Sequence, residues 1–346
     1  MPPQLTLIVP VYNGAAHLAE MLDTVAAQTF QDWTCLCIND GSTDQSESIV
    51  REYASRDTRF ELISKKNGGT GSARNTGLEQ VRTPYVMFAD QDDWLHPQSF
   101  EAAFALIQSS GADIVTFERV RVFGGKYVPA RIDVRKLVAQ PMAVDFKEQF
   151  ILGGDKFTCF VWQRIFKAQA IRDVFFPEVS GGEDIVYMYE LAYQVKKWAY
   201  CDVVLYAIRE NPKSTSRTVS SNYVSGFLKV LKELSAAMKK HSVADEVRKS
   251  LLMKSFVGFT LVCTLFAGRG KNAKATFAIL SNLFAEIDSE EYRASRLSVA
   301  QQVVLRALRR RRYGVLIVFA WVFLPYFERD RIFAGLRQRL GLKGAA

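Results

Sequence analysis

The first 120 residues alternate between short apolar runs and stretches with helical periodicity. The apolar runs cover residues 5–9, 35–38, 60–63 and 85–89. After the first run, Leu18, Met21 and Leu22 recur at the spacing of one helix face. Strands that are apolar throughout and are separated by helices are typical of a parallel sheet with both faces covered. The pattern therefore predicts an α/β domain.

The pattern is less regular after residue 120. A helix is predicted to begin at residues 183–184, and a short apolar run covers 203–208. From about residue 223 onward, strand patterns give way to long helical ones, including 247–267 and 299–327. The last third of the chain is therefore predicted to be a separate helical region.

Polar residues follow each of the four predicted strands. The carboxyl ends of parallel strands meet at one edge of a sheet, and open α/β sheets bind their ligands there. The residues that follow the strands are Tyr12, Asn13, Asp40, Asn67 with glycines 68, 69 and 71, and Asp90, Asp92 and Asp93. The sequence therefore predicts a single binding edge.

The tetrapeptide Asp90-Gln91-Asp92-Asp93 carries the strongest chemical signal. Two carboxylates that flank one residue at a strand end can share Mg²⁺ or Mn²⁺, which substrate phosphates and water usually complete. A solvated acidic turn before the next helix is the alternative. Asp40 and Arg74 favour the metal site, because they add a ribose or base ligand and a phosphate counter-charge at the same edge.

The glycine-rich stretch at 67–75 lacks the spacings of a dinucleotide fingerprint and of a P-loop. A flexible turn with one exposed arginine is one interpretation. Beside an acidic metal site, however, an arginine such as Arg74 is what a diphosphate requires.

Four motifs in this order resemble those of the family 2 glycosyltransferases. They are residues 8–13, 39–44, 69–75 and 88–93. The family consists of inverting enzymes with the GT-A fold, and the chain resembles its bacterial surface-glycan members. The resemblance implies a mainly parallel central sheet. It also implies a nucleotide-sugar-binding half at 1–120 and an acceptor-binding half at 121–218, followed here by the helical basic region at 219–346.

The resemblance also implies roles for single residues. Those expected to bind the nucleotide are Pro10, Val11, Tyr12, Asp40, Asn67, Arg74 and Asp90. Asp92, together with Asp90, would ligate the Mn²⁺ or Mg²⁺ that bridges the diphosphate and neutralises charge on the leaving group. In the family an Asp within a Glu-Asp pair at a helix start supplies the base. Asp184 is therefore the expected base, and Glu183 would support it or bind the acceptor. Two helix-N-terminal carboxylates favoured by the helix dipole are the alternative.

Charge is distributed unevenly over the 346 residues, whose net charge is +9. Residues 1–120 hold 8 Lys and Arg against 16 Asp and Glu, whereas 301–346 hold 10 against 2. The segment 306–327 joins arginines to an apolar, aromatic run, which suits a helix lying on an anionic membrane surface. A buried helix in a homo-oligomer interface is the alternative. A nucleic-acid partner is disfavoured, because no binding motif is present and the acidic half would repel phosphate.

The N-terminus and the cysteines do not change the predicted fold or site. No apolar stretch reaches the roughly 20 residues that span a bilayer, and the N-terminus lacks a signal-peptide pattern, which favours a cytoplasmic location. Five cysteines without C-x-x-C spacing indicate neither a disulfide framework nor a zinc site.

The sequence thus predicts a metal-dependent inverting glycosyltransferase. It would move a hexosyl or N-acetylhexosaminyl group from a nucleotide sugar, expected to be a UDP-sugar, to a hydroxyl of a glycan or lipid-linked glycan in surface polysaccharide synthesis. One alternative is a polyprenyl-phosphate glycosyltransferase. The other is a non-catalytic subunit that binds nucleotide sugars.

Overall fold

The computed structural model describes residues 2–123, 125–141, 159–179, 181–210, 221–244, 252, 274, 277–282 and 299–318. The chain divides into two compact units. The first consists of Met1–Glu178 and Glu183–Glu210, and the second consists of Val179–Gly182 and Asn211–Ala346.

The first unit begins with four parallel strands, as the apolar runs predict. They are β1 (Leu5–Val11), β2 (Trp33–Asn39), β3 (Phe60–Ser64) and β4 (Tyr85–Phe88). Their order in the sheet is β3-β2-β1-β4. The connecting helices are α1 (Leu18–Ala26), α2 (Ser46–Arg56) and α3 (Thr70–Gln80). The α/β prediction is confirmed for this half.

The second half of the sheet is mixed rather than mainly parallel. Its elements are β5 (Trp94–Leu95), α4 (Ser99–Ser110), β6 (Ile114–Val122), η1 (Val134–Lys136), β7 (Gln140–Pro141), β8 (Arg164–Lys167), α6 (Ala168–Ile171), α7 (Glu183–Gln194) and β9 (Trp198–Arg209). The strand order continues β4-β8-β6-β9-β5. Strand β8 is antiparallel to both of its neighbours, and β9 is parallel to β6 but antiparallel to β5 and β7. The short strands β5, β7 and β8 are too brief to show a periodicity of their own.

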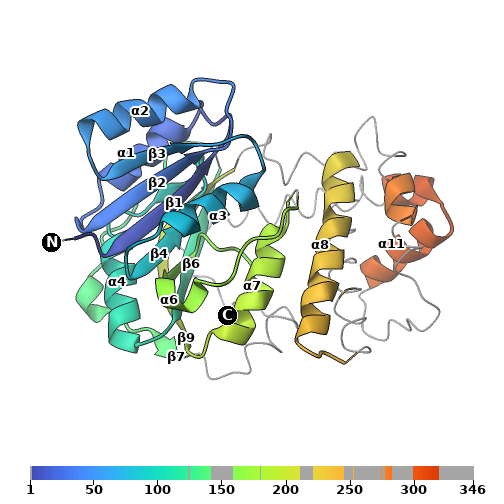
Figure 1. The fold of residues 1–346 in the computed structure, drawn as a ribbon. Helices are drawn as coiled ribbons and strands as arrows, with labels where there is room; N and C mark the ends of the chain where they lie inside the picture. Colours follow the sequence, from blue (N-terminus) through green and yellow to red (C-terminus); the bar gives the residue numbers. More distant parts are fainter. Residues whose placement is uncertain are drawn as a thin grey trace. The chain divides into compact units, whose positions relative to one another are not determined.

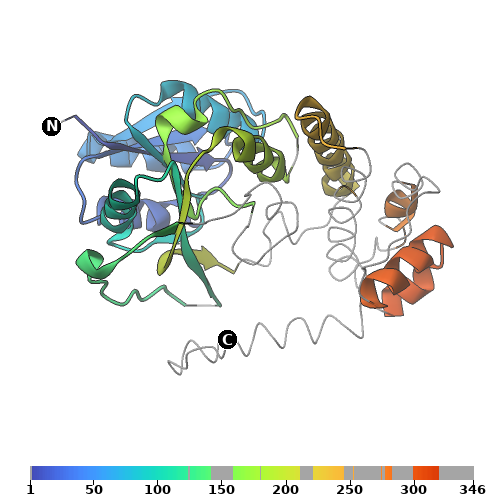
Figure 2. The ribbon, with the colours of Figure 1, turned by 90° about the horizontal axis from the view of Figure 1, so that it is seen from below.

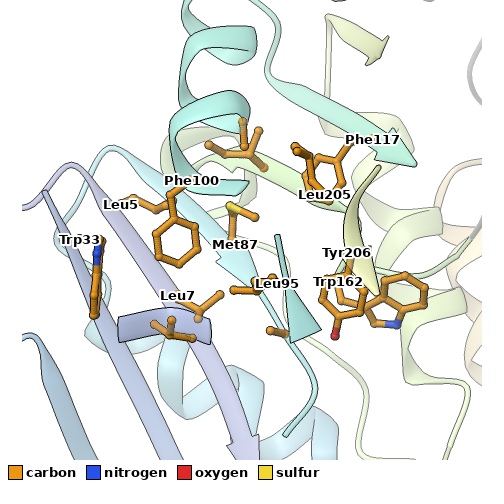
Figure 3. Packing of buried hydrophobic residues seen from close by; sticks show 14 of the residues in the cluster. Leu5, Leu7, Trp33, Met87, Leu95, Phe100, Phe117, Trp162, Leu205 and Tyr206 are labelled. Carbon is orange, nitrogen blue, oxygen red and sulfur yellow. The ribbon is translucent and has the colours of Figure 1, made fainter. Parts of the chain in front are cut away.

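Two hydrophobic cores lie on opposite faces of this sheet. Because side chains alternate along a strand, Leu5, Leu7 and Val9 of β1 enter one core, whereas Ile8 enters the other. The first core includes residues of α1, α2 and α4, and Figure 3 shows part of its packing. The second core includes residues of α3 and α7. Helices accordingly lie on both sides of the strands in views at right angles (Figures 1 and 2).

In the second unit the structure describes two long helices. They are α8 (Ser221–Lys240) and α11 (Val299–Arg309). The predicted helical pattern at 247–267 lies almost wholly outside the described residues, as does the part of 306–327 beyond residue 318. Among the described residues, no helix combines the length and apolar character needed to cross a membrane.

Candidate active site

The acidic loop, residues 90–93, leaves the carboxyl end of β4 at the edge where ligands are expected. The Asp92 carboxylate accepts no side-chain hydrogen bond from any described residue. Burial and the neighbouring charge of Asp90 raise its pKa to about 6, whereas Arg209 lowers it. A carboxylate that is repelled by its neighbour and has free lone pairs is suited to a divalent cation.

The loop is joined to the end of β1 through Gln91. The Tyr12 amide donates to Gln91 Oε1 at 2.9 Å, and Gln91 Nε2 donates to the Tyr12 carbonyl at 2.9 Å. A Cβ on Gly14 would lie 2.2 Å from Gln91 Oε1, so a larger residue there would displace the Gln91 amide. Two of the predicted motifs are thus joined by an amide pair that no local sequence pattern predicts.

Asp40 organises the glycine-rich loop after β3. Its carboxylate is buried and accepts hydrogen bonds from the Gly68 and Gly69 amides at 2.9 and 2.7 Å and from Lys65 Nζ at 2.7 Å. The Asn67 side chain donates to the Asp40 carbonyl at 2.9 Å. Gly69 has φ +87°, a backbone conformation that favours glycine. Asp40 and Asn67, predicted to bind nucleotide, therefore lie together.

Arg74 connects three carboxylates that are far apart in the sequence. Its Nη2 donates to Asp90 Oδ1 at 3.0 Å, and its Nη1 donates to Glu183 Oε1 at 3.0 Å and to Asp184 Oδ1 at 2.5 Å. The Arg74 side chain is only 4% exposed. Four predicted site residues thus meet in one cluster, which joins the acidic loop to the first turn of α7.

Asn75, next to Arg74, fixes the segment that leads to α7. Its side chain accepts from the Phe176 amide at 2.8 Å and donates to the Phe176 carbonyl at 2.9 Å. The Phe176 ring stacks on Tyr187 of α7 with centroids 3.8 Å apart. A Cβ on Gly71 would lie 3.1 Å from Phe176 Cβ, so α3 and this segment are in close contact.

The Asp184 carboxylate has a pKa close to neutrality. Burial raises its pKa to about 7, Arg74 opposes that shift, and the charges of Glu183 and Asp90 reinforce it. The Val161 amide also donates to this carboxylate and lowers the pKa. A carboxylate with a pKa near neutrality can accept a proton from a hydroxyl and release it to solvent.

The described residues offer few side-chain ligands for the expected metal. Among the described residues, no group of three or more His, Cys, Asp and Glu side chains is placed to hold an ion. The unshared oxygens of Asp90 and Asp92 fit two positions of a divalent cation whose other ligands come from substrate phosphates and water.

The remaining predicted residues lie at the end of β1. Pro10 and Val11 are buried within the strand, and the Val11 carbonyl accepts from the Asp40 amide at 2.8 Å. Tyr12 is 47% exposed. Only Tyr12 of these three therefore presents a large side-chain surface to a ligand.

Comparison with known proteins identifies the family of one domain in the chain. Residues 6–175 match the sequence model of Glycosyl transferase family 2. The chain carries a glycosyltransferase family 2 domain. This domain contains all four predicted motifs, whereas Glu183 and Asp184 follow its matched part.

The relatives found by sequence include bacterial glycosyltransferases. The chain is 29% identical to "Uncharacterized glycosyltransferase EpsJ" of Bacillus subtilis over 62% of its own length and 63% of that protein. It is 28% identical to "Glycosyltransferase GlyA" of Streptococcus pneumoniae over 66% of its own length and 34% of that protein. The chain therefore spans less than two thirds of both relatives.

Solved structures show the fold. TarS 1-349 of S. aureus, solved in complex with UDP-GlcNAc, is similar with a TM-score of 0.65 at 19% identity, over 92% of this chain and 91% of that one. The prediction of a GT-A fold is confirmed.

Proposed function

We propose that this protein is a metal-dependent inverting glycosyltransferase that uses a UDP-sugar as donor. The observation that carries the proposal is the cluster in which Arg74 joins Asp90 of the acidic loop to Asp184 of α7. Asp90, which is suited to hold a metal, and Asp184, which is suited to accept a proton, thus bind the same guanidinium. The UDP-GlcNAc bound in TarS supports the choice of donor.

The mechanism assigns separate tasks to the carboxylates. Asp90 and Asp92 would hold Mn²⁺ or Mg²⁺, which when bound neutralises charge on the departing diphosphate. Asp184 takes the proton of the acceptor hydroxyl as its oxygen attacks the sugar from the side opposite the diphosphate, and this single displacement inverts the anomeric carbon. Arg74 orients Asp184, and Glu183 supports it or contacts the acceptor.

Nucleotide binding is assigned to the ends of β1 and β2 and to the glycine-rich loop. Tyr12, with Pro10 and Val11 beneath it, would contact the nucleobase. The Asp40 carboxylate accepts three hydrogen bonds, which leaves one lone pair to accept from a uracil N–H. Asn67 supports this loop.

We assign the acceptor to the surface glycans of bacteria. Another relative is "Poly(ribitol-phosphate) beta-glucosyltransferase" of Bacillus spizizenii, 25% identical over 73% of this chain and 39% of that protein. A β-linked product from an α-linked donor requires inversion. We also propose a cytoplasmic location for the protein. Residues 1–120 would bind the donor and residues 121–218 the acceptor. The region 219–346 would contact a membrane or a second copy of the chain.

Site variants test the proposal. Incubation with Mn²⁺ and a panel of nucleotide sugars should release UDP from one UDP-sugar when an acceptor glycan is added. Asp92→Ala should abolish metal-dependent release, and Asp184→Asn should lower transfer by about 10²- to 10⁴-fold, the usual contribution of a general base. Asp202→Asn, which changes an exposed aspartate of β9, is the control.

The two alternatives give different outcomes. A polyprenyl phosphate is already ionised and needs no base, so transfer to it would survive Asp184→Asn. A non-catalytic subunit would show metal-dependent UDP binding by calorimetry without turnover on any acceptor.

A further inference from the structure

Strand β9 contacts the acidic loop through a fully buried tyrosine. The Tyr206 hydroxyl accepts from the Asp90 amide at 2.9 Å and donates to Asp93 Oδ2 at 2.9 Å. The other Asp93 oxygen accepts from the Arg209 amide at 2.8 Å. Tyr206 has no exposed surface and Asp93 is 5% exposed. The loop is therefore bonded to β9 on its buried side.

The Arg209 side chain holds the other end of the loop. Its Nε donates to the Asp92 carbonyl at 2.9 Å, and its Nη2 donates to Glu20 at 2.6 Å. The guanidinium lies 3.7 Å from the ring centroid of Trp94. Trp94 Nε1 in turn donates to Glu20 at 2.9 Å. The position of Arg209 is thus set by stacking and an ion pair together.

We propose that Tyr206 and Arg209 are positioning residues that hold Asp90 and Asp92 in the geometry that a divalent cation requires. The inference rests on the proposed function. Tyr206 binds the backbone N–H of Asp90 and Arg209 binds the backbone C=O of Asp92, so neither uses the carboxylate oxygens. Outer groups that orient metal ligands typically change metal affinity 10- to 100-fold when removed.

A purely structural role would predict a different pattern. The Tyr206 ring also stacks on Trp162 with centroids 4.6 Å apart, and Figure 3 shows both rings in the core. Tyr206→Phe keeps this stacking and removes only the hydroxyl. A structural role would lower thermal stability without a specific effect on the metal, whereas a positioning role lowers metal affinity beyond any loss of stability.

The test compares two tyrosines of the same strand. Tyr200→Phe is the control, because the Tyr200 hydroxyl donates to Glu118 at 2.6 Å rather than to the acidic loop. In full-length protein saturated with UDP, Mn²⁺ binding is titrated by electron paramagnetic resonance. Tyr206→Phe should bind Mn²⁺ at least tenfold more weakly than Tyr200→Phe. UDP binding in EDTA should be equal in the two.

Arg209→Lys is a second variant, which serves if Tyr206→Phe does not fold. Lysine keeps the charge beside Glu20 but loses the Nε–H that binds the Asp92 carbonyl. Arg209→Lys should weaken Mn²⁺ binding in the same way as Tyr206→Phe. Arg121→Lys is the control and should not weaken it, because Arg121 pairs with Glu210. If the folded variants bind Mn²⁺ as tightly as wild type, the inference about Tyr206 and Arg209 is overturned, but the proposed metal site is not. A failure of the unmodified protein to bind Mn²⁺ would overturn the proposed metal site and the inference with it.

Discussion

A single buried guanidinium, that of Arg74, compensates three carboxylates at the site. A buried ion pair is costly to desolvate, and removing one partner typically costs about 3–5 kcal/mol because the other charge stays buried. Burial disfavours the charged form of Arg74, but the negative charges of Asp184, Asp90 and Glu183 stabilise that form by more. The pKa of Arg74 is therefore raised. The four residues therefore depend on one another, and the cluster carries a net negative charge before any ligand binds.

The pKa of Asp184 predicts the pH dependence of transfer. A general base acts when deprotonated, and burial raises the pKa of Asp184 to about 7. The rate at saturating Mn²⁺ and donor should therefore fall about tenfold for each pH unit below this value and level off above it. Initial rates between pH 5.5 and 8.5 measure this. A rate that stays constant down to pH 5.5 would contradict the assignment of Asp184, and donor KM measured in parallel separates any effect on metal binding.

The sequence predicts the carboxylates of the site but not their partners. The strand ends predict Asp90 and Asp92, and the resemblance to the family implies Asp184. Arg74 was expected to bind phosphate, and its pairing with Asp184 depends on a contact across 110 residues that no local pattern encodes. Tyr206 was missed for the same reason, since its role follows from the position of β9 in the sheet.

At the scale of elements, the close packing of α3 on β1 depends on Gly77. A Cβ there would lie 2.5 Å from Cγ2 of Ile8, which is fully buried. Alanine is better than glycine in a helix by about 1 kcal/mol, whereas overpacking a core costs about 1–3 kcal/mol. Because Ile8 is fully buried, the close contact should outweigh the helix gain, and Gly77→Ala should lower the free energy of unfolding by up to about 2 kcal/mol.

Urea unfolding of the full chain measures this effect. Glu79→Ala changes an exposed residue of the same helix and should stay within about 0.5 kcal/mol of wild type. An increase in stability for Gly77→Ala would show that Ile8 can change its rotamer.

The elements also show which part of the fold the sequence could predict. Strands β1 to β4 are short, largely apolar runs separated by helical stretches, so the local pattern of the sequence was sufficient to predict them. Strand β8 has only four residues, and its direction and place between β4 and β6 are set by tertiary pairing. The antiparallel part of the sheet could not be predicted from the sequence for that reason.

At the scale of the whole molecule, the basic C-terminal region predicts membrane association. Arg306 and the four arginines at 309–312 are exposed in the described residues, and Val315 and Val318 nearby are also exposed. A basic residue near an anionic surface contributes about 1 kcal/mol. Changing the four arginines at 309–312 to Gln should therefore weaken binding to vesicles that contain phosphatidylserine by about 10²- to 10³-fold.

Flotation of the full chain with such vesicles at low salt measures this binding. Changing four exposed lysines of α8 to Gln is the charge-matched control; they are Lys229, Lys232, Lys239 and Lys240. Equal flotation of the arginine variant and the unmodified protein would contradict the membrane contact. A concentration-dependent change in mass that is lost in the arginine variant would favour the oligomer interface.

The insertion of β8 between β4 and β6 has a consequence for how the chain is made. Residues 85–88 and 114–122 leave the ribosome well before residues 164–167, which must pair with both. During that interval β4 and the apolar first half of β6 expose unpaired backbone edges, which promote pairing with other chains. We therefore expect nascent chains that end before residue 164 to need a chaperone, and the central sheet to close only as the region that carries Asp184 is synthesised.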